Sequence, residues 1–265
     1  MKPSKLIVRR IFNGVARLLT GIVCRVHAKS LTKIPLRGPI IIIVNHVNFL
    51  ELPIIYPRIP SDLGVGYSKA ENWNNLLFRT LFTNWDLIPI ERDEVDVTAL
   101  RKGLRALEEG RILFITPEGT RSHHGRLQQG KPGVVLMAER SGAPIWPIAC
   151  YGGETFTQNL KRLRRTDFYV VVGNPFHVDT RGVKITGPVR QQVVDEMMYQ
   201  IAALLPPRYR GYYSDLSAAT EIFLKFEAPE KSNLWRARQG SSATQEGSSP
   251  TARGKAGVLD RRSIH

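Results

Sequence analysis

The chain has 265 residues, enough for one substantial domain, and its apolar content of 42% is ordinary for a globular core. Its two cysteines, Cys24 and Cys150, exclude a disulfide framework and favour a reducing, intracellular setting. The formal net charge of +15 belongs mainly to the two ends, because no acidic residue precedes Glu51 and basic residues outnumber acidic ones after residue 230. Basic ends attract polyanions, either nucleic acid or an anionic membrane surface.

Residues 1–33 are predicted to form a basic amphipathic helix at a membrane interface. Apolar residues recur there at helical spacing, at Ile7, Ile11, Val15, Leu18, Ile22 and Val26. Arg9, Arg10 and Arg17 fall on the other side and interrupt every window of the ~20 apolar residues that a spanning helix needs. The stretch also lacks the apolar core and cleavage site of a signal peptide. The pattern favours a helix lying in the interface, with packing on the protein's own core as the alternative.

Segments of strand and helix character alternate from residue 38 onward. Strands are predicted at 40–44, 64–68, 87–90, 112–116, 145–150 and 168–172, and helices at 95–109, 132–141 and 189–205. This alternation predicts an α/β fold with a mixed, largely parallel sheet flanked by helices, over a domain of residues 34–229. Residues 230–265 have almost nothing apolar to bury and are predicted to be a disordered basic tail.

Asn45 and His46 come directly after the first predicted strand of this domain. The carboxyl end of a strand in a doubly wound sheet faces the ligand crevice, and an imidazole accepts a proton near neutral pH. Glu51 can accept a hydrogen bond from the second ring nitrogen if the chain turns after Phe49 and folds back. The pair therefore indicates a general base with an orienting carboxylate. The alternative is a loop histidine beside a solvated acid.

The stretch "FITPEGTRS", residues 114–122, also leaves an apolar strand directly. Gly119 allows the backbone to approach a ligand, and Thr120 and Arg121 offer a hydroxyl and a guanidinium suited to a phosphate. Lys131 precedes a predicted helix whose free N–H groups would add affinity for an anion. Two such strand ends predict chemistry on a phosphorylated substrate, and a surface arginine on a turn is the alternative. The chain has no Gly-x-Ser-x-Gly elbow and no Walker loop, which disfavours a serine hydrolase or a nucleoside triphosphatase.

Several short motifs occur in a fixed order along residues 38–213. They are Asn45-His46-x4-Glu51, Lys69-Ala70-Glu71, Ile90-Glu91-Arg92, Pro117-Glu118-Gly119-Thr120-Arg121-Ser122, Lys131-x-Gly133 and Ala143-Pro144-Ile145-Trp146-Pro147-Ile148. In order and spacing they resemble the lysophospholipid acyltransferase family, that is, the bacterial 1-acyl-sn-glycerol-3-phosphate acyltransferases and their relatives. The stretch "LPPRYRGYYSD", residues 205–215, resembles the end of that domain.

The resemblance implies a mechanism and a set of site residues. His46, with Glu51, would remove the proton from a glycerol hydroxyl, which then attacks the thioester of acyl-CoA or acyl carrier protein. Asn45 and Lys69 would shape the site. No metal or resident cofactor is expected, since the thioester is a co-substrate. The residues implied to hold the acceptor phosphate are Glu118, Gly119, Thr120, Arg121, Lys131 and Arg92.

One position departs from the family pattern. The family has aspartate where this chain has Glu51, and the extra methylene has to be absorbed by the loop. We expect the loop to be shaped for glutamate, because the rest of the phosphate motif is present.

We therefore expect a peripheral enzyme at the cytoplasmic face of the cell membrane that acylates a lysophospholipid in phospholipid synthesis. Lysophosphatidate is the default acceptor, and other lysophospholipids or glycerol phosphate remain open. The expected partners are the lysophospholipid, the anionic bilayer surface and the thioester donor. Nucleic acid is not expected, because the middle of the chain is nearly neutral and lacks a basic–aromatic motif. The alternative is a non-catalytic lysolipid- or phosphate-binding membrane protein with a degenerate His-x4-Glu dyad.

Overall fold

The computed structural model describes residues 3–59, 63–91 and 96–235 as an α/β fold built on a seven-stranded sheet. The strand order is β1-β7-β6-β2-β5-β3-β4. Only β7 and β6 pair in antiparallel fashion within this sheet, so it is mixed and largely parallel, as predicted. The strands are β1 (Cys24–His27), β2 (Ile40–Val44), β3 (Gly64–Lys69), β4 (Leu87–Ile90), β5 (Ile112–Ile115), β6 (Ile145–Tyr151) and β7 (Thr166–Val172), with a separate pair β8 (His177–Val178) and β9 (Leu224–Lys225).

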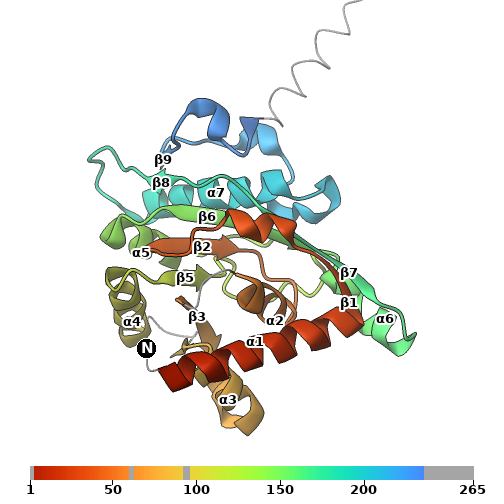
Figure 1. Cartoon of the computed structure of the whole chain (residues 1–265). Helices are drawn as coiled ribbons and strands as arrows, with labels where there is room; N and C mark the ends of the chain where they lie inside the picture. Colours follow the sequence, from red (N-terminus) through yellow and green to blue (C-terminus); the bar gives the residue numbers. More distant parts are fainter. Residues whose placement is uncertain (1–2, 60–62, 92–95, 236–265) are drawn as a thin grey trace, which may run out of the picture.

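Helices cover both faces of the sheet (Figure 1). On one face, Ile41 and Ile43 of β2 share an apolar core with α4, α5 and α7. On the other face, Ile42 and Val44 pack with α2 and α6. A strand that is buried on both sides requires such a continuous apolar run, and β2 has one because it is the central strand. The helices are α1 (Pro3–Val23), α2 (Glu51–Ile55), α3 (Leu76–Asn84), α4 (Val97–Glu108), α5 (Gly133–Ser141), α6 (Phe156–Lys161) and α7 (Gly187–Leu204).

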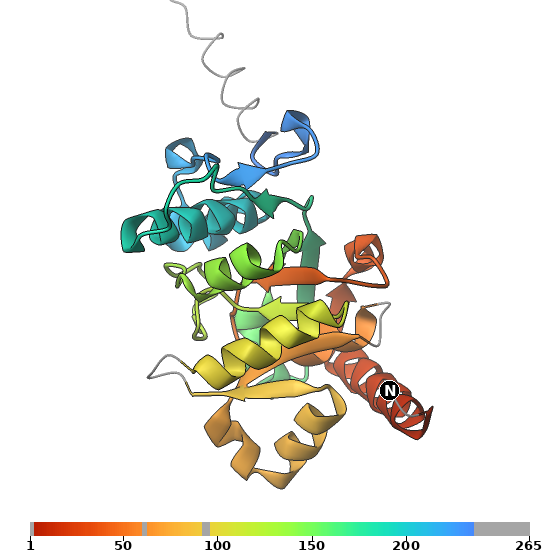
Figure 2. The same cartoon turned by 90° about the vertical axis from the view of Figure 1, so that its left-hand side faces the viewer.

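Helix α1 lies along the outside of the domain, at the side away from α7, in both views (Figures 1 and 2). Its polar stripe faces the protein. Arg9 is 1% exposed, and it donates to Asp86 Oδ2 and Gly64 O at 3.3 and 3.1 Å. Trp85 Nε1 donates to Asn13 Oδ1, and Arg17 Nε donates to Pro57 O. These contacts fix the rotation of the helix about its axis.

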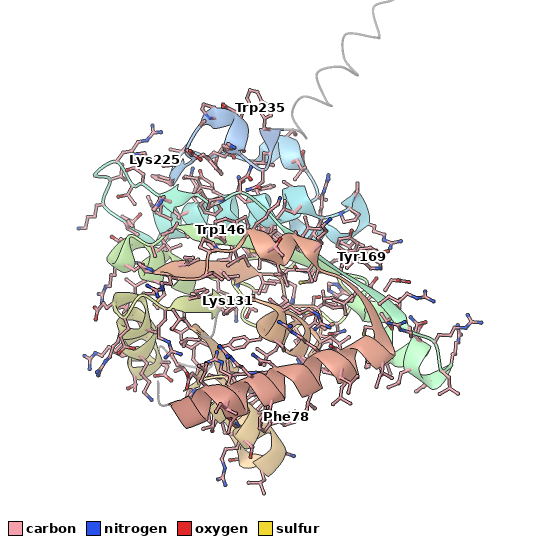
Figure 3. The ribbon with its side chains drawn as sticks, viewed as in Figure 1. Phe78, Lys131, Trp146, Tyr169, Lys225 and Trp235 are labelled. Atoms are coloured by element: carbon pink, nitrogen blue, oxygen red, sulfur yellow. The ribbon has the colours of Figure 1, made fainter. Side chains whose placement is uncertain are left out.

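The apolar stripe of α1 therefore faces outward. Its large side chains are between 50% and 65% exposed: Ile7, Ile11, Val15, Leu18 and Ile22. Phe78 of the neighbouring helix α3 is 46% exposed, and it lies just beyond α1 in Figure 3. A helix that packs on its own core normally buries its apolar stripe. The alternative prediction, that α1 packs this stripe against the protein, is therefore wrong.

Two boundaries of the predicted organisation are corrected by the structure. The predicted N-terminal helix of residues 1–33 ends at Val23, because the next residues form β1 and Val26 pairs with Phe168 of β7. The predicted tail is ordered in its first part, since Leu234 is fully buried and Asn233 donates to Gln200 Oε1 and Asn174 O. The rest of the tail prediction, for residues 236–265, lies outside the described residues.

A pair of glycines tests the helix packing. A Cβ on Gly103, inside α4, would overlap Tyr67 Oη and lie 2.6 Å from Met137 Cε, whereas nothing lies within 4 Å of a Cβ on Gly14 in α1. We predict that Gly103→Ala lowers the free energy of unfolding by about 2 kcal/mol, because the overlap outweighs the gain in helix propensity. Gly14→Ala should raise it by about 0.5–1 kcal/mol. Urea unfolding measures both, and a stabilising Gly103→Ala would contradict the packing of α4 on β3 and α5.

Candidate active site

The carboxyl end of β2 brings His46 against Glu51, the first residue of α2. His46 Nδ1 lies 2.9 Å from Glu51 Oε2. Glu51 is 4% exposed, whereas the His46 side chain is 20% exposed and so can be reached from outside. When Nδ1 donates its hydrogen to the carboxylate, Nε2 is the proton acceptor. The structure thus assembles the predicted pair in the geometry of a general base and its orienting group.

Asn48 explains how the loop accommodates a glutamate. The backbone N–H of Asn48 donates to both Glu51 carboxylate oxygens, at 3.1 and 3.2 Å. Its side-chain oxygen accepts from Leu50 N in an Asx turn, and its amide nitrogen donates to Gly153 O. These bonds therefore fix the turn so that the longer glutamate side chain reaches His46 Nδ1. Sequence reasoning missed Asn48, although an asparagine three residues before a helix start is a recognisable turn signal.

Asn45 shapes the exit of the chain from β2, and its side chain is buried. It is 1% exposed, and its side chain pairs with the backbone of Cys150, with Nδ2 donating to Cys150 O and Oδ1 accepting from Cys150 N. This pair extends the hydrogen bonding between β2 and β6 by one residue past the end of β2. Burial raises the pKa of the Cys150 thiol well above its ordinary value, so the thiol stays protonated and is not a nucleophile.

Glu118 has a different place from the one predicted. It was expected to hold the acceptor phosphate, but it is 2% exposed and both of its oxygens accept from backbone amides. Oε1 accepts from His46 N at 2.7 Å, and Oε2 accepts from Gln128 N at 2.9 Å. Ser122 N also donates to His46 O. The loop that follows β2 and carries His46 therefore runs beside the second loop, which follows β5 and carries Glu118. Glu118 thus positions His46 relative to the second loop and does not face a substrate.

The environment of Glu118 makes its charge costly. Burial raises the pKa of this carboxyl group to about 6, and the hydrogen bonds from His46 N and Gln128 N oppose the rise. The charged form is therefore the dominant one only above that pH. We therefore expect the free energy of unfolding, to which Glu118 contributes, to change with pH around 6.

The second loop presents its cations outward. Gly119 has a φ of +69°, and a Cβ there would lie 3.0 Å from Lys131 Cδ and 3.5 Å from its Nζ. Lys131 thus lies across a position where only glycine leaves it room. Thr120, Arg121 and Lys131 are exposed. Within the described parts of the chain, neither Arg121 nor Lys131 forms an ion pair, so both charges are available to an anion.

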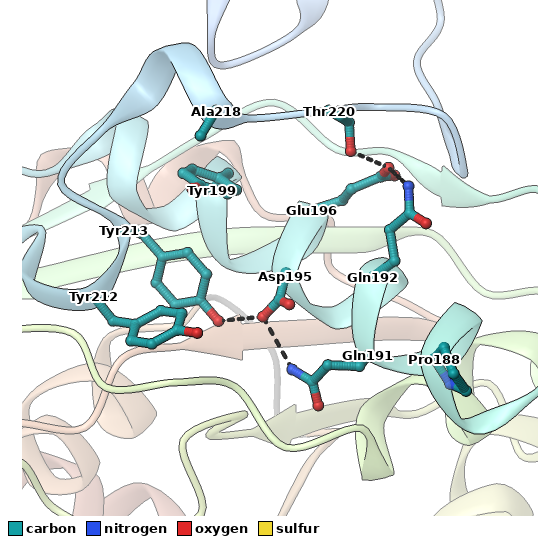
Figure 4. A pocket seen from close by; sticks show the side chains of 10 residues that line it. All are labelled: Pro188, Gln191, Gln192, Asp195, Glu196, Tyr199, Tyr212, Tyr213, Ala218 and Thr220. Carbon is teal, nitrogen blue, oxygen red and sulfur yellow. Dashed lines mark hydrogen bonds between the residues drawn. The ribbon is translucent and has the colours of Figure 1, made fainter.

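A hydrogen-bonded network behind this loop holds Gly130, the residue before Lys131, and Figure 4 shows the side chains of the network, Tyr213, Asp195 and Gln191. Gly130 N donates to Tyr213 Oη at 2.9 Å, and Gly130 O accepts from Gln191 Nε2 at 3.1 Å. Both partners donate to Asp195 Oδ1 on α7, Tyr213 at 2.6 Å and Gln191 at 3.0 Å. The network therefore fixes the backbone that carries Lys131. Sequence reasoning missed it, because its members lie about 60 to 80 residues further along the chain.

The remaining predicted site residues are placed as follows. Lys69 ends β3 at the same edge of the sheet. Its Nζ lies 2.6 Å from Glu71 Oε1, so the lysine forms an ion pair with a residue two positions further along the chain. Arg92 lies outside the described residues. The structure thus brings together His46, Glu51, Asn45, Gly119, Thr120, Arg121 and Lys131 at one edge of the sheet.

Comparison with known proteins agrees with this geometry. The acyltransferase family model matches residues 25–151, which contain both loops. The 1-acyl-sn-glycerol-3-phosphate acyltransferase LPAT1 of Arabidopsis thaliana chloroplasts is 24% identical over 203 residues, which are 71% of this chain and 55% of that protein. The enzyme of the same name from Borreliella burgdorferi is 29% identical over 130 residues, which are 46% of this chain and 50% of that protein. The matches therefore span about half the length of these curated relatives.

A solved structure shares the fold. The crystal structure of the 1-acyl-sn-glycerophosphate (LPA) acyltransferase PlsC from Thermotoga maritima aligns with a TM-score of 0.57 and 20% sequence identity. The alignment covers 74% of this chain and 80% of that chain. The matched segment and the named relatives identify residues 25–151 as a segment of the acyltransferase family, similar to the 1-acyl-sn-glycerol-3-phosphate acyltransferases, and the solved structure shows the same fold.

Proposed function

We propose that this protein transfers a fatty acyl group from the thioester of acyl-CoA or acyl carrier protein to the free hydroxyl of a lysophospholipid. The default acceptor is 1-acyl-glycerol-3-phosphate, which is the acceptor in the names of the curated relatives. One observation carries the proposal. The His46–Glu51 pair, at 2.9 Å, and the outward-facing Arg121 and Lys131 share one edge of the sheet and are joined by Glu118.

The proposed reaction needs one base and no covalent enzyme intermediate. His46 Nε2 removes the proton from the acceptor hydroxyl, and the oxygen forms a bond to the thioester carbonyl carbon. The carbon–sulfur bond then breaks, and the thiolate takes the proton back from the imidazolium. Glu51 stabilises the imidazolium in between. The thioester is already activated, and the two buried cysteines are not required as nucleophiles.

Arg121 and Lys131 are the proposed partners of the acceptor phosphate. A guanidinium forms two parallel hydrogen bonds to a phosphate, and an ammonium adds a mobile point charge. Helix α5 begins two residues after Lys131, and the positive end of its dipole adds to the attraction. Holding the phosphate here places the hydroxyl of the same small molecule near His46.

The outward apolar face of α1 supports a peripheral position on a membrane. In the part of the chain that the structure describes, no helix is long and apolar enough to cross a bilayer. A helix with its polar stripe bonded to the protein and its apolar stripe exposed fits the boundary between lipid headgroups and acyl chains. We assign the cytoplasmic face of the cell membrane, where the acceptor and the product reside.

The alternative is a membrane protein that binds lysolipid without consuming a thioester. It would bind the lipid phosphate through Arg121 and Lys131, and His46 would take no part in a reaction. The contacts of Glu51 favour the enzyme, because Asn48 N holds the carboxylate toward the imidazole. A protein that only binds lipid does not need that alignment.

Turnover separates the two candidates. We predict thiol release from acyl-CoA with lysophosphatidate, and a fall in kcat of at least ~100-fold in His46→Ala, since the general base is lost. Glu51→Asp should also lower kcat by ~10-fold or more, because the shorter carboxylate cannot reach Nδ1 from this loop. His177→Ala is the matched control, since His177 lies in the separate two-stranded sheet, and it should keep wild-type turnover. Full activity in His46→Ala would contradict the mechanism.

The acceptor phosphate can be tested by comparing two acceptors. We predict that Arg121→Ala raises the KM for lysophosphatidate by ~10-fold or more, because a charge-assisted hydrogen bond is lost. The KM for an uncharged monoacylglycerol should be unchanged. Arg126→Ala, another exposed arginine of the same loop, is the control. An equal loss with both acceptors would show that Arg121 does not bind the phosphate.

The role of Glu118 predicts a pH-dependent stability. Its pKa is raised from 4.5 to about 6 in the folded protein, so its contribution to the free energy of unfolding is largest below pH 4.5 and is lost as the pH rises through about 6. Relative to Glu118→Gln, which does not titrate, the wild type should lose about 2 kcal/mol between the two limits. Urea unfolding of both proteins over this range measures the difference. A constant difference would mean that the carboxyl group is not buried as described.

A further inference from the structure

The segment from the end of α6 to the start of β7, residues 160–165, combines exposed leucines with basic side chains, and we name it the basic turn. Leu163 is 95% exposed, the highest value among the described large apolar side chains, and Leu160 is 46% exposed. The other four residues are basic and exposed: Lys161, Arg162, Arg164 and Arg165. In the described structure, Lys161, Arg162 and Arg164 make no ion pair. The turn therefore offers a positive, partly apolar surface.

Folding does not account for Leu163. Its φ is +53°, in the left-handed region, where it closes the C-terminus of α6. Leu163 N donates to Leu160 O, and Arg164 N donates to Asn159 O. Glycine fits such a closing position best, because a Cβ is strained there. A leucine at this position strains the backbone and is 95% exposed, so no contact within the described structure accounts for it.

The basic turn continues the exposed face of α1. Arg165 Nη2 donates to Gly21 O at 2.7 Å and to Cys24 O at 2.8 Å, so the turn is fastened to the C-terminal end of α1. The exposed Ile22 lies in the same last turn of the helix. Figure 1 shows α6 beside this end of α1. The two elements are thus neighbours in space, although about 140 residues separate them in the sequence.

The other end of α6 meets residues 45–50, the loop between β2 and α2 that carries His46, which we call the catalytic loop. Phe156, the first residue of α6, packs edge-on against Phe49, with 5.6 Å between the ring centroids. Phe49 lies between His46 and Glu51 in the sequence and is 55% exposed. Helix α6, which has six residues, therefore connects the catalytic loop at its N-terminus with the basic turn at its C-terminus.

We propose that the basic turn is a second membrane-docking element, which inserts Leu163 among the acyl chains of an anionic phospholipid bilayer. Lys161, Arg162 and Arg164 contact the lipid phosphates, and this charge complementarity is the reason for choosing an anionic bilayer as the partner. The inference rests on the membrane-associated function proposed above. Docking through α1 alone gives the domain a single line of contact with the bilayer. A second contact at the far end of α6 from the catalytic loop fixes the orientation and turns the exposed side of His46 toward the bilayer.

A dye at residue 163 tests the contact directly. Both native cysteines are fully buried, so an environment-sensitive thiol dye labels the new cysteine of Leu163→Cys in the full chain. On vesicles of phosphatidylcholine and phosphatidylglycerol in equal parts, we expect a blue shift and quenching by brominated acyl chains. Leu36→Cys is the control. Leu36 is also exposed but precedes β2, at the edge of the sheet opposite His46, and it should show neither change.

Vesicle affinity gives the quantitative test. Leu163→Gly removes the apolar side chain and suits the left-handed backbone, so the fold is retained. It should weaken binding by about fivefold or more. Lys161→Gln/Arg162→Gln/Arg164→Gln should weaken it by about 100-fold, since each basic group near the surface contributes about fivefold. The matched control is Arg101→Gln/Lys102→Gln/Arg105→Gln on α4, which changes the net charge equally on another surface. It should stay within about threefold of the wild type.

The outcomes separate this proposal from the proposed activity. Turnover is also measured with a water-soluble, short-chain lysophosphatidate, for which the variants of the basic turn should match the wild type. On vesicles they should be slower. An unshifted dye together with unchanged affinities would overturn the second docking element. A wild type that is inactive with both acceptors would contradict the acyltransferase instead, while the dye and affinity results would still decide the question of docking.

Discussion

The buried carboxylate of Glu118 is the contact on which the two halves of the site depend. β2 and β5 are parallel neighbours, so the loops that follow them leave the same edge of the sheet, but pairing of the strands does not fix the loops themselves. Glu118 fixes them by accepting from His46 N with one oxygen and from Gln128 N with the other. Burying a charge costs free energy, which two charge-assisted hydrogen bonds offset in part. The benefit is a fixed distance between His46 and the cations Arg121 and Lys131, which the proposed acyl transfer to a small phosphorylated acceptor requires.

Around this contact, the supporting groups come from all parts of the domain. Asn48 orients Glu51, and the Tyr213–Asp195 pair of the C-terminal region holds Gly130 in front of Lys131. The site is therefore held by many hydrogen bonds on the protein side, whereas Phe49 beside it and the basic turn at the far end of α6 are exposed. A rigid catalytic edge with an apolar, cationic rim suits a substrate that stays partly in a bilayer.

The sequence predicted the elements whose signals are local. β2 and β4 begin and end as predicted, because each is an apolar run with clear boundaries. β1 was missed because its four residues continue the helical spacing of α1, and its pairing partner β7 lies about 140 residues away. The spacing of apolar residues also identified the two faces of α1, but the inward position of its polar face depends on Asp86 and Gly64, which only the fold brings to Arg9. The motif that contains Glu118 was identified correctly, yet no spacing rule shows that its carboxylate points inward.

The central claim is that one edge of the sheet holds both the base and the phosphate of a single acceptor. The most direct measurement is a structure of the full chain with lysophosphatidate bound in the absence of a thioester. The account predicts that the phosphate contacts Arg121 and Lys131, and that the free hydroxyl oxygen lies within about 3 Å of His46 Nε2. A lysophosphatidate that binds with its phosphate away from these two cations, or with its hydroxyl turned away from His46, would contradict it.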